Sequence, residues 1–177
     1  MTVDDASGTT SGSGRSGVHW LVFLGLAAVV VVLDQVTKAI LVANLDPGEV
    51  VTLIGDYVRL VFSQNSGALF GMFKDQAILF GIVSIGVVGL IVYYHGQAGR
   101  SLYMSIALGL LLGGAVGNMA DRLRLGYVVD FVDIGIGDLR WYTFNVADAA
   151  ISTSIVMLVA VALVPALGRA VDGRSGG

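Results

Sequence analysis

The chain contains no cysteine in its 177 residues, which excludes disulfides, thiolate metal sites and a cysteine nucleophile. Histidine is scarce as well: only His19 and His95 occur, and there is no HExxH motif of the kind that indicates a zinc peptidase. Glutamate occurs once, at Glu49, so nearly all of the 13 acidic residues are aspartates. Acid–base chemistry in this protein therefore falls to aspartate, and we expect neither a metal nor another cofactor.

Charge is also sparse. Asp, Glu, Lys and Arg make up 13% of the chain, hydrophobic residues make up 55%, and the mean hydropathy is +0.83. The net charge of -3 and the lack of a basic run argue against nucleic acid as a partner, because nucleic-acid binding needs a positive surface. A chain this apolar is typical of an integral membrane protein rather than a water-soluble domain.

Four apolar segments each come close to the ~20 residues that a helix needs to cross a bilayer. The first could be mistaken for a signal peptide, but an Asp-Gln pair interrupts it and no small-residue cleavage site follows Val32. The predicted fold class is an all-α membrane protein with four transmembrane helices and a small β element on one membrane face. The four segments cover about residues 18–42, 76–94, 101–119 and 146–167.

The β element is predicted from the two long connections between these segments. Runs of β-branched and aromatic residues flank Gly55-Asp56 in the first connection and Gly135 to Asp138 in the second. Such runs on either side of turn residues are typical of β-hairpins. We therefore predict one hairpin within residues 43–75 and another within residues 120–145.

The two ends of the chain have little to bury. Residues 1–17 consist mostly of Gly, Ser, Thr and Asp, and the end of the chain is similarly polar. Both are predicted to be disordered tails, 1–17 and 169–177, around a single membrane domain, 18–168. Four spans would place both tails on the same side of the membrane, and the positions of Lys and Arg do not decide which side this is.

Polar side chains from distant segments are predicted to meet at one membrane face, because successive helices alternate in direction. A carboxylate at a bilayer boundary is costly unless it is paired, hydrated or used, so such a cluster is a functional-site hypothesis. His19 and His95 fall at the opposite end and in the short connection, away from this face. The residues expected at the shared face are Asp34, Lys38, Asn65, Asn118, Asp121, Arg122, Asp130, Asn145 and Asp148.

Spacing along the helices predicts pairs within this cluster. Asp34 and Lys38 are four residues apart, so they share a helix face and can form an ion pair. Asn118, Asp121 and Arg122 are also expected on one face, with Arg122 paired to Asp121 so that this aspartate stays ionised. Arg122 has an alternative role, which is to hold a substrate carbonyl or a lipid phosphate through its several donors.

Other positions have a structural interpretation that competes with a functional one. Asn145 followed by Asp148 has the spacing of a helix N-cap with an acid three residues later. The GxxxGxxxG stripe at residues 109–117 is predicted to allow close helix packing. Gly67 is predicted to let the backbone approach a neighbouring helix or an extended peptide.

The remaining chemistry is that of two neighbouring carboxylates, one protonated and one ionised, which activate water against a peptide carbonyl. Three alternatives stay open. One is a Ser-Lys dyad that uses Lys38. Another is a small proton-coupled transporter with Asp34 and Asp148 as a relay, although a transporter is expected to show internal repeats and this chain has no obvious one. The third is a non-catalytic scaffold packed through the glycine stripe.

Four motifs of the chain resemble those of the lipoprotein signal peptidases (signal peptidase II), which are bacterial membrane aspartyl proteases. The resemblance covers about residues 18–167, and the last two motifs are highly specific in their order and spacing. These motifs are DQVTK (34–38), QNSGALFG (64–71), GGAVGNMADRLRLGYVVDFVD (113–133) and FNVAD (144–148).

The resemblance implies an activity and a location. The activity is removal of the signal peptide from a prolipoprotein, just before a cysteine that carries diacylglycerol, by a metal-independent aspartic endopeptidase among membrane lipids. The location is the bacterial cytoplasmic membrane, with both tails in the cytoplasm and the active site at the extracytoplasmic face. By the same resemblance Asp130 and Asp148 are the catalytic pair, and the supporting positions are Asp34, Lys38, Asn65, Asn118, Arg122 and Asn145. Gly67 and Asp121 are further candidates for substrate binding or support of the site.

Overall fold

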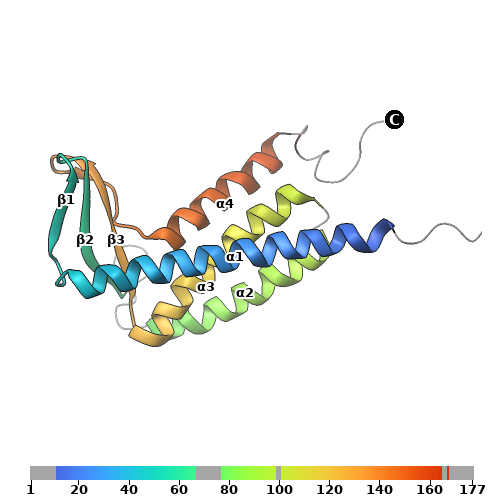
Figure 1. The fold of residues 1–177 in the computed structure, drawn as a ribbon, viewed down its shortest axis with the longest axis horizontal. Coiled ribbons are helices and arrows are strands. Elements are labelled where there is room, and N and C mark those ends of the chain that lie inside the picture. The colour runs from blue at the N-terminus through green and yellow to red at the C-terminus, as the bar shows by residue number, and fades with distance from the viewer. Residues whose placement is uncertain (1–10, 67–76, 99–100, 165–166, 168–177) are drawn as a thin grey trace, which may run out of the picture.

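Four long helices and one small sheet make up the computed structural model, which describes residues 11–66, 77–98, 101–164 and 167. In Figure 1 the helices run side by side, the sheet lies at one end of them, and α1 begins and α4 ends at the other end. Each predicted apolar segment corresponds to one of these helices. The helices are α1 (Ser11–Asn44), α2 (Ala77–Ala98), α3 (Leu102–Leu125) and α4 (Val146–Leu163).

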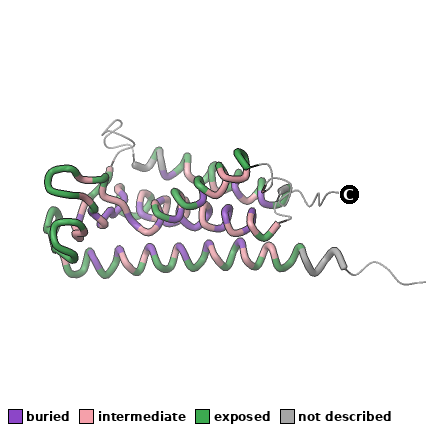
Figure 2. Tube along the Cα trace, turned by 90° about the horizontal axis from the view of Figure 1, so that it is seen from above, coloured by how far each residue is buried: buried purple, intermediate pink, exposed green. Residues whose placement is uncertain are grey.

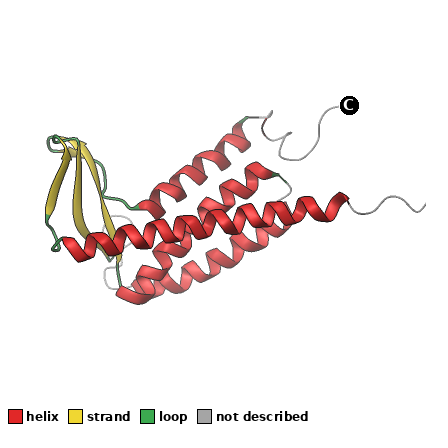
Figure 3. Ribbon diagram, in the orientation of Figure 1, coloured by secondary structure: helices red, strands yellow, loops and turns green. Residues whose placement is uncertain are grey.

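The sheet is antiparallel and has the strand order β1-β2-β3-β4. Both predicted hairpins are present, β1 with β2 and β3 with β4, and pairing of β2 with β3 joins them into one sheet. Figure 3 shows that all strands lie at the same end of the helices. The strands are β1 (Val50–Ile54), β2 (Val58–Asn65), β3 (Val128–Ile136) and β4 (Leu139–Arg140).

The helix α3 is the centre of the bundle, because it packs against α1, α2 and α4. Within the most apolar stretch of α3, 56% is buried inside the protein, whereas the share is 17% in the corresponding stretches of α1 and α4. In Figure 2 the buried positions of α1 follow the side that faces the other helices, and the opposite side is exposed. The main apolar core consists of Phe23, Ala27, Ile91, Met104, Leu108 and Leu112.

Close contact between α1 and α3 depends on the glycine stripe of α3. A Cβ atom added at Gly113 would lie 2.6 Å from the Cβ of Val30 and 2.8 Å from the carbonyl oxygen of Ala27. A Cβ atom added at Gly117 would lie 2.7 Å from the Oδ2 atom of Asp34. The predicted packing role of the stripe is therefore confirmed, and the stripe also makes room for a carboxylate between the two helices.

Three helices in the described part of the chain are long and apolar enough to cross a membrane: Ser16–Asn44, Leu102–Leu125 and Val146–Leu163. The helix α2 contains a shorter apolar stretch, Gly81–Gln97. Leucine, isoleucine and valine side chains remain exposed on the outward faces of these helices, as at Leu21, which is 73% exposed. Such outward apolar faces fit a helix bundle whose solvent is lipid.

The first helix begins earlier than the sequence predicts. Residues 11–17, which we expected to belong to a disordered tail, form the first turns of α1. Extending an existing helix needs no new nucleation, so even residues with low helix propensity can continue it. The predicted tail residues 1–10 and 169–177 lie outside the described residues.

Candidate active site

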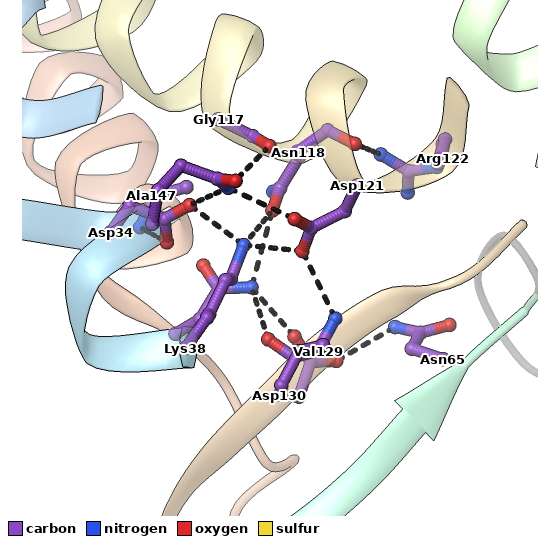
Figure 4. A network of polar contacts seen from close by, with 12 residues as sticks. Asp34, Lys38, Asn65, Gly117, Asn118, Asp121, Arg122, Val129, Asp130 and Ala147 are labelled. Carbon is purple, nitrogen blue, oxygen red and sulfur yellow. Dashed lines mark hydrogen bonds and ion pairs between the residues drawn. The ribbon is translucent and has the colours of Figure 1, made fainter. Parts of the chain in front are cut away.

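Polar residues from the three helices α1, α3 and α4 and from the strands β2 and β3 meet at the end of the bundle where the sheet lies (Figure 4). The structure brings together nine of the predicted residues in one hydrogen-bonded network. Gly67 lies outside the described residues. The nine residues are Asp34, Lys38, Asn65, Asn118, Asp121, Arg122, Asp130, Asn145 and Asp148.

Lys38 lies at the centre of this network and is 2% exposed. Its Nζ atom is 2.8 Å from the Oδ2 atom of Asp34, as the spacing on the helix predicts, and 2.8 Å from the Oδ2 atom of Asp121 across the interface with α3. It also donates a hydrogen bond of 3.2 Å to the Oδ1 atom of Asn118. The three protons of one ammonium group thus have three partners, which is the condition for keeping a charge in a buried site.

The two carboxylates that flank Lys38 each accept a hydrogen bond from a backbone amide. In both cases this amide belongs to the residue directly before a candidate catalytic aspartate. Asp121 accepts from the amide of Val129, at 3.2 Å, directly before Asp130. Asp34 accepts from the amide of Ala147, at 3.0 Å, directly before Asp148. One buried ion-pair triad therefore fixes the backbone beside both members of the predicted pair.

The start of α4 is a capping box that also belongs to the site. The side chain of Asn145 accepts a hydrogen bond from the amide of Asp148, at 2.8 Å, and the Asp148 carboxylate accepts one from the amide of Asn145, at 3.3 Å. Asn118 donates a second hydrogen bond of 2.8 Å to the carboxylate of Asp148. The capping interpretation is therefore confirmed, and the cap fixes the orientation of Asp148.

Asp130 lies on β3 and receives hydrogen bonds on both carboxylate oxygens. Asn145 donates to its Oδ1 atom at 2.7 Å, and Asn65 donates to its Oδ2 atom at 3.0 Å. The pKa of Asp130 is raised from its usual 3.8 to about 6, chiefly by burial and also by the nearby Asp148 carboxylate, against the opposing effect of the Asn65 and Asn145 hydrogen bonds. The structure thus favours a proton on Asp130 more than on an ordinary aspartate.

The predicted ion pair between Asp121 and Arg122 is wrong. Asp121 pairs with Lys38, and at 3.9 Å with Arg124, whereas Arg122 donates to the carbonyl oxygen of Asn118 at 3.4 Å. Consecutive residues point in different directions on a helix, so Asp121 and Arg122 do not face one another. Arg122 interacts electrostatically with Asp148, Asp130 and, less strongly, Asp121, without forming an ion pair with Asp121. Its alternative role toward a substrate stays a prediction.

Gln35 is a member of the network that the sequence did not indicate as a site residue. Its side-chain amide donates to Asp121 at 2.9 Å, to Asp34 at 3.2 Å and to the carbonyl oxygen of Gly117 at 3.3 Å. A polar residue beside Asp34 in an apolar helix was the available signal. It was missed because consecutive residues do not normally share a helix face.

His95 lies away from this network. Its ring stacks on Phe23 with the ring centroids 3.9 Å apart, and its Nε2 atom is 3.1 Å from the hydroxyl of Ser105. Within the described ranges of the chain, no three His, Asp or Glu side chains are arranged to hold a metal ion. The absence of a metal requirement remains a prediction.

The fold and the site together define a helical membrane protein with a pair of carboxylates in a buried polar network. Comparison with known proteins identifies its relatives. A family model described as signal peptidase (SPase) II matches residues 26–164. The chain belongs to the signal peptidase II family and is therefore a bacterial membrane peptidase.

Individual relatives agree with this assignment. A lipoprotein signal peptidase of Rhodococcus jostii is 39% identical over 91% of this chain and 82% of its own length. A lipoprotein signal peptidase of Moorella thermoacetica is 39% identical over 81% of this chain and 94% of its own length. A solved structure described as a bacterial membrane enzyme has a TM-score of 0.74 and 29% identity, and the match covers 91% of this chain and 94% of that one.

The central position of Lys38 predicts a large loss of stability when its charge is removed. Lys38→Met leaves two buried carboxylates without their shared cation, which costs about 3 to 5 kcal/mol of unfolding free energy. Arg124→Met is the matched control, because Arg124 also approaches Asp121 but is 64% exposed and 3.9 Å away. Unfolding free energies measured by steric trapping in bicelles should separate the two variants, and equal losses would contradict the central role of Lys38.

The environment of Asp130 predicts an unusual titration. Its carboxyl should lose its proton near pH 6, and Asp148→Asn should lower this pKa because it removes a neighbouring negative charge. Because the folded-state pKa lies above the usual 3.8, ionisation of Asp130 destabilises the fold as the pH rises from about 4 through about 6. Carbon-13 NMR of labelled aspartate tests this, with the exposed Asp46→Asn as a control that leaves the titration unchanged. A midpoint near 4 would refute it.

Proposed function

We propose that this protein removes the signal peptide from prolipoproteins, just before a diacylglyceryl-modified cysteine, by aspartyl-protease chemistry with Asp130 and Asp148. One observation carries the choice of residues. Asn145 donates to both carboxylates, from its side chain to Asp130 at 2.7 Å and from its backbone to Asp148 at 3.3 Å. The names of the relatives support the substrate class.

In this proposal the two carboxyl groups divide the acid and base roles. Burial favours the protonated form of Asp130, so Asp130 donates its proton toward the oxygen of the scissile carbonyl. The ionised Asp148 accepts a proton from the attacking water, whose oxygen forms the new bond to the carbonyl carbon. When the C–N bond breaks, Asp148 returns that proton to the leaving amine, and the hydroxyl of the collapsing intermediate returns one to Asp130.

Arg122 is assigned a role toward the substrate in the same proposal. Its guanidinium makes one hydrogen bond of 3.4 Å to Asn118, and its charge acts on both Asp148 and Asp130. A planar cation beside the pair can hold a backbone carbonyl of the bound peptide or a lipid phosphate through its remaining donors. We therefore expect Arg122 to place the substrate rather than to transfer a proton.

We also propose an orientation in the membrane. All four helices, including α2, cross the bacterial cytoplasmic membrane, both chain ends lie in the cytoplasm, and the sheet lies at the extracytoplasmic face. The support is functional, because a prolipoprotein is processed after export, and the site lies at the end of the bundle opposite the start of α1 and the end of α4 (Figure 1).

The three alternative functions that the sequence left open are less well supported than the aspartyl-protease proposal. Membership of a peptidase family does not support a proton-coupled transporter or a non-catalytic scaffold. A Ser-Lys dyad needs an unprotonated lysine as its base. The amine of Lys38 lies between the carboxylates of Asp34 and Asp121 and also donates to Asn118, so it serves as a cation.

Substitution of the pair tests the proposal. Asp130→Asn and Asp148→Asn should each lower turnover of a diacylglyceryl-modified prolipoprotein by more than about 100-fold, because an amide keeps the volume but cannot exchange a proton with water. Asp138→Asn, an exposed position in the same connection, is the control and should retain turnover. Product is measured by mass spectrometry with purified, folded protein. If Asp121→Asn is folded and inactive while Asp130→Asn remains active, the pair is wrongly assigned.

A further inference from the structure

One buried side-chain amide, that of Asn118, connects the ammonium group of Lys38 to the carboxylate of Asp148. The Oδ1 atom of Asn118 accepts a hydrogen bond of 3.2 Å from Lys38, and its Nδ2 atom donates one of 2.8 Å to the Oδ1 atom of Asp148. Lys38 and Asn118 are both buried, so salt and water screen this connection little. We call the arrangement of Lys38, Asn118 and Asp148 the amide bridge.

The groups around Asn118 fix which end of its amide faces Asp148. The ammonium group of Lys38 carries only donors, so it requires the oxygen of Asn118. Asn145 requires the same oxygen, because its Nδ2 atom donates to Asn118 at 3.2 Å while its own oxygen accepts from the backbone amide of Asp148 at 2.8 Å. The nitrogen of Asn118 therefore has to face the carboxylate of Asp148.

A donor in this position favours the ionised form of a carboxyl group. A hydrogen bond to a carboxylate stabilises its negative charge, and a donor that is itself bonded to a cation is polarised in the same direction. The backbone amide of Asn145 gives Asp148 a second donor, at 3.3 Å. Asp148 also lies in the first turn of α4, where the helix start carries a partial positive charge. These three effects have the same sign.

The environment of Asp130 is different. Its donors are the neutral side chains of Asn65 and Asn145, and Asp130 is 3% exposed, whereas Asp148 is only partly buried. Lys38 acts on the pKa of Asp130 through space, with a smaller effect than burial or either asparagine. The buried cation thus acts unequally on the two members of the pair.

Other charged groups also surround the start of α4. Arg122 acts on Asp148 through space, whereas Lys38 is linked to Asp148 through the amide of Asn118. The amide bridge is therefore the hydrogen-bonded route by which a cation reaches this carboxylate in the described part of the site. The charged groups that face the start of α4 are Asp34 and Lys38 on α1, Asp121 and Arg122 on α3, and Asp130 on β3.

We propose that Asn118 is a positioning residue that makes Asp148, rather than Asp130, the member of the pair that accepts a proton from water. It does so by holding an N–H group, oriented by the charge of Lys38, against the Asp148 carboxylate. This inference rests on the proposed function, because it gives a cause for the division of acid and base roles stated there. It also gives Lys38 an effect on the chemistry that is separate from its stabilisation of the fold.

The pH dependence of kcat/KM for a diacylglyceryl-modified prolipoprotein tests the proposal, because this ratio reports the ionisations of the free enzyme. One ionised and one protonated carboxyl give a bell-shaped profile whose two limbs belong to the coupled pair, so the observable is the shift of a limb on substitution. Asn118→Leu removes the donor to Asp148. It should move the acidic limb upward by about one pH unit, the size expected for one hydrogen bond to a charged group, and leave the alkaline limb in place.

A second substitution and a matched control sharpen this test. Asn118→Asp keeps the acceptor for Lys38 but replaces the donor with a carboxylate oxygen. Because Lys38 keeps the introduced carboxylate ionised, the shared proton stays on Asp148, and the acidic limb should move further than in Asn118→Leu. Asn65→Leu is the control, since it removes a donor from Asp130 instead, and it should raise the alkaline limb alone.

Two results would overturn the proposal. One is an equal loss of kcat/KM at every pH with both limbs in place, which would show that Asn118 only supports the fold. The other is a shift of the alkaline limb by the Asn118 substitutions, which would place the effect of the donor on Asp130. If Asn118→Leu fails to fold, Asn118→Asp decides between the same outcomes. Failure of the proposed function would look different, because Asp130→Asn or Asp148→Asn would then remain active.

Discussion

The position of one buried ammonium group, that of Lys38, is the constraint on which the geometry of the site depends. Asp34 and Asp121 are both fully buried, and two carboxylates so close together would repel one another without a shared cation. With Lys38 between them, each carboxylate also accepts a hydrogen bond from a backbone amide. Asp34 accepts one from Ala147, and Asp121 accepts one from Val129. The charge of Lys38 thus connects three helices and the sheet.

This arrangement explains why packing and function use the same residues. The absence of a side chain at Gly117 makes room for the Asp34 carboxylate, since an added Cβ would lie 2.7 Å from its Oδ2 atom. Asn145 caps α4 and at the same time donates to Asp130. A structural role for the glycine stripe and for the cap therefore does not compete with catalysis. Both roles are needed to hold two carboxylates in a fixed relation.

The elements and the meeting place of the site could be predicted from the sequence, because they depend on local periodicity and on the alternating direction of helices. The Asp34–Lys38 pair follows from spacing on a single helix. The partners across elements could not be predicted. The pairing of Lys38 with Asp121, the role of Gln35 and the joining of two hairpins through β2 and β3 depend on how α1, α3 and the sheet pack together.

The most direct test of the account is a single turnover of a diacylglyceryl-modified prolipoprotein in isotopically labelled water that also contains hydroxylamine. Two carboxyl groups that activate water form no acyl-enzyme. The account therefore predicts a released signal peptide that ends in a carboxylate with one oxygen from the labelled water. A signal peptide that ends in a hydroxamate would reveal a covalent intermediate and contradict the account.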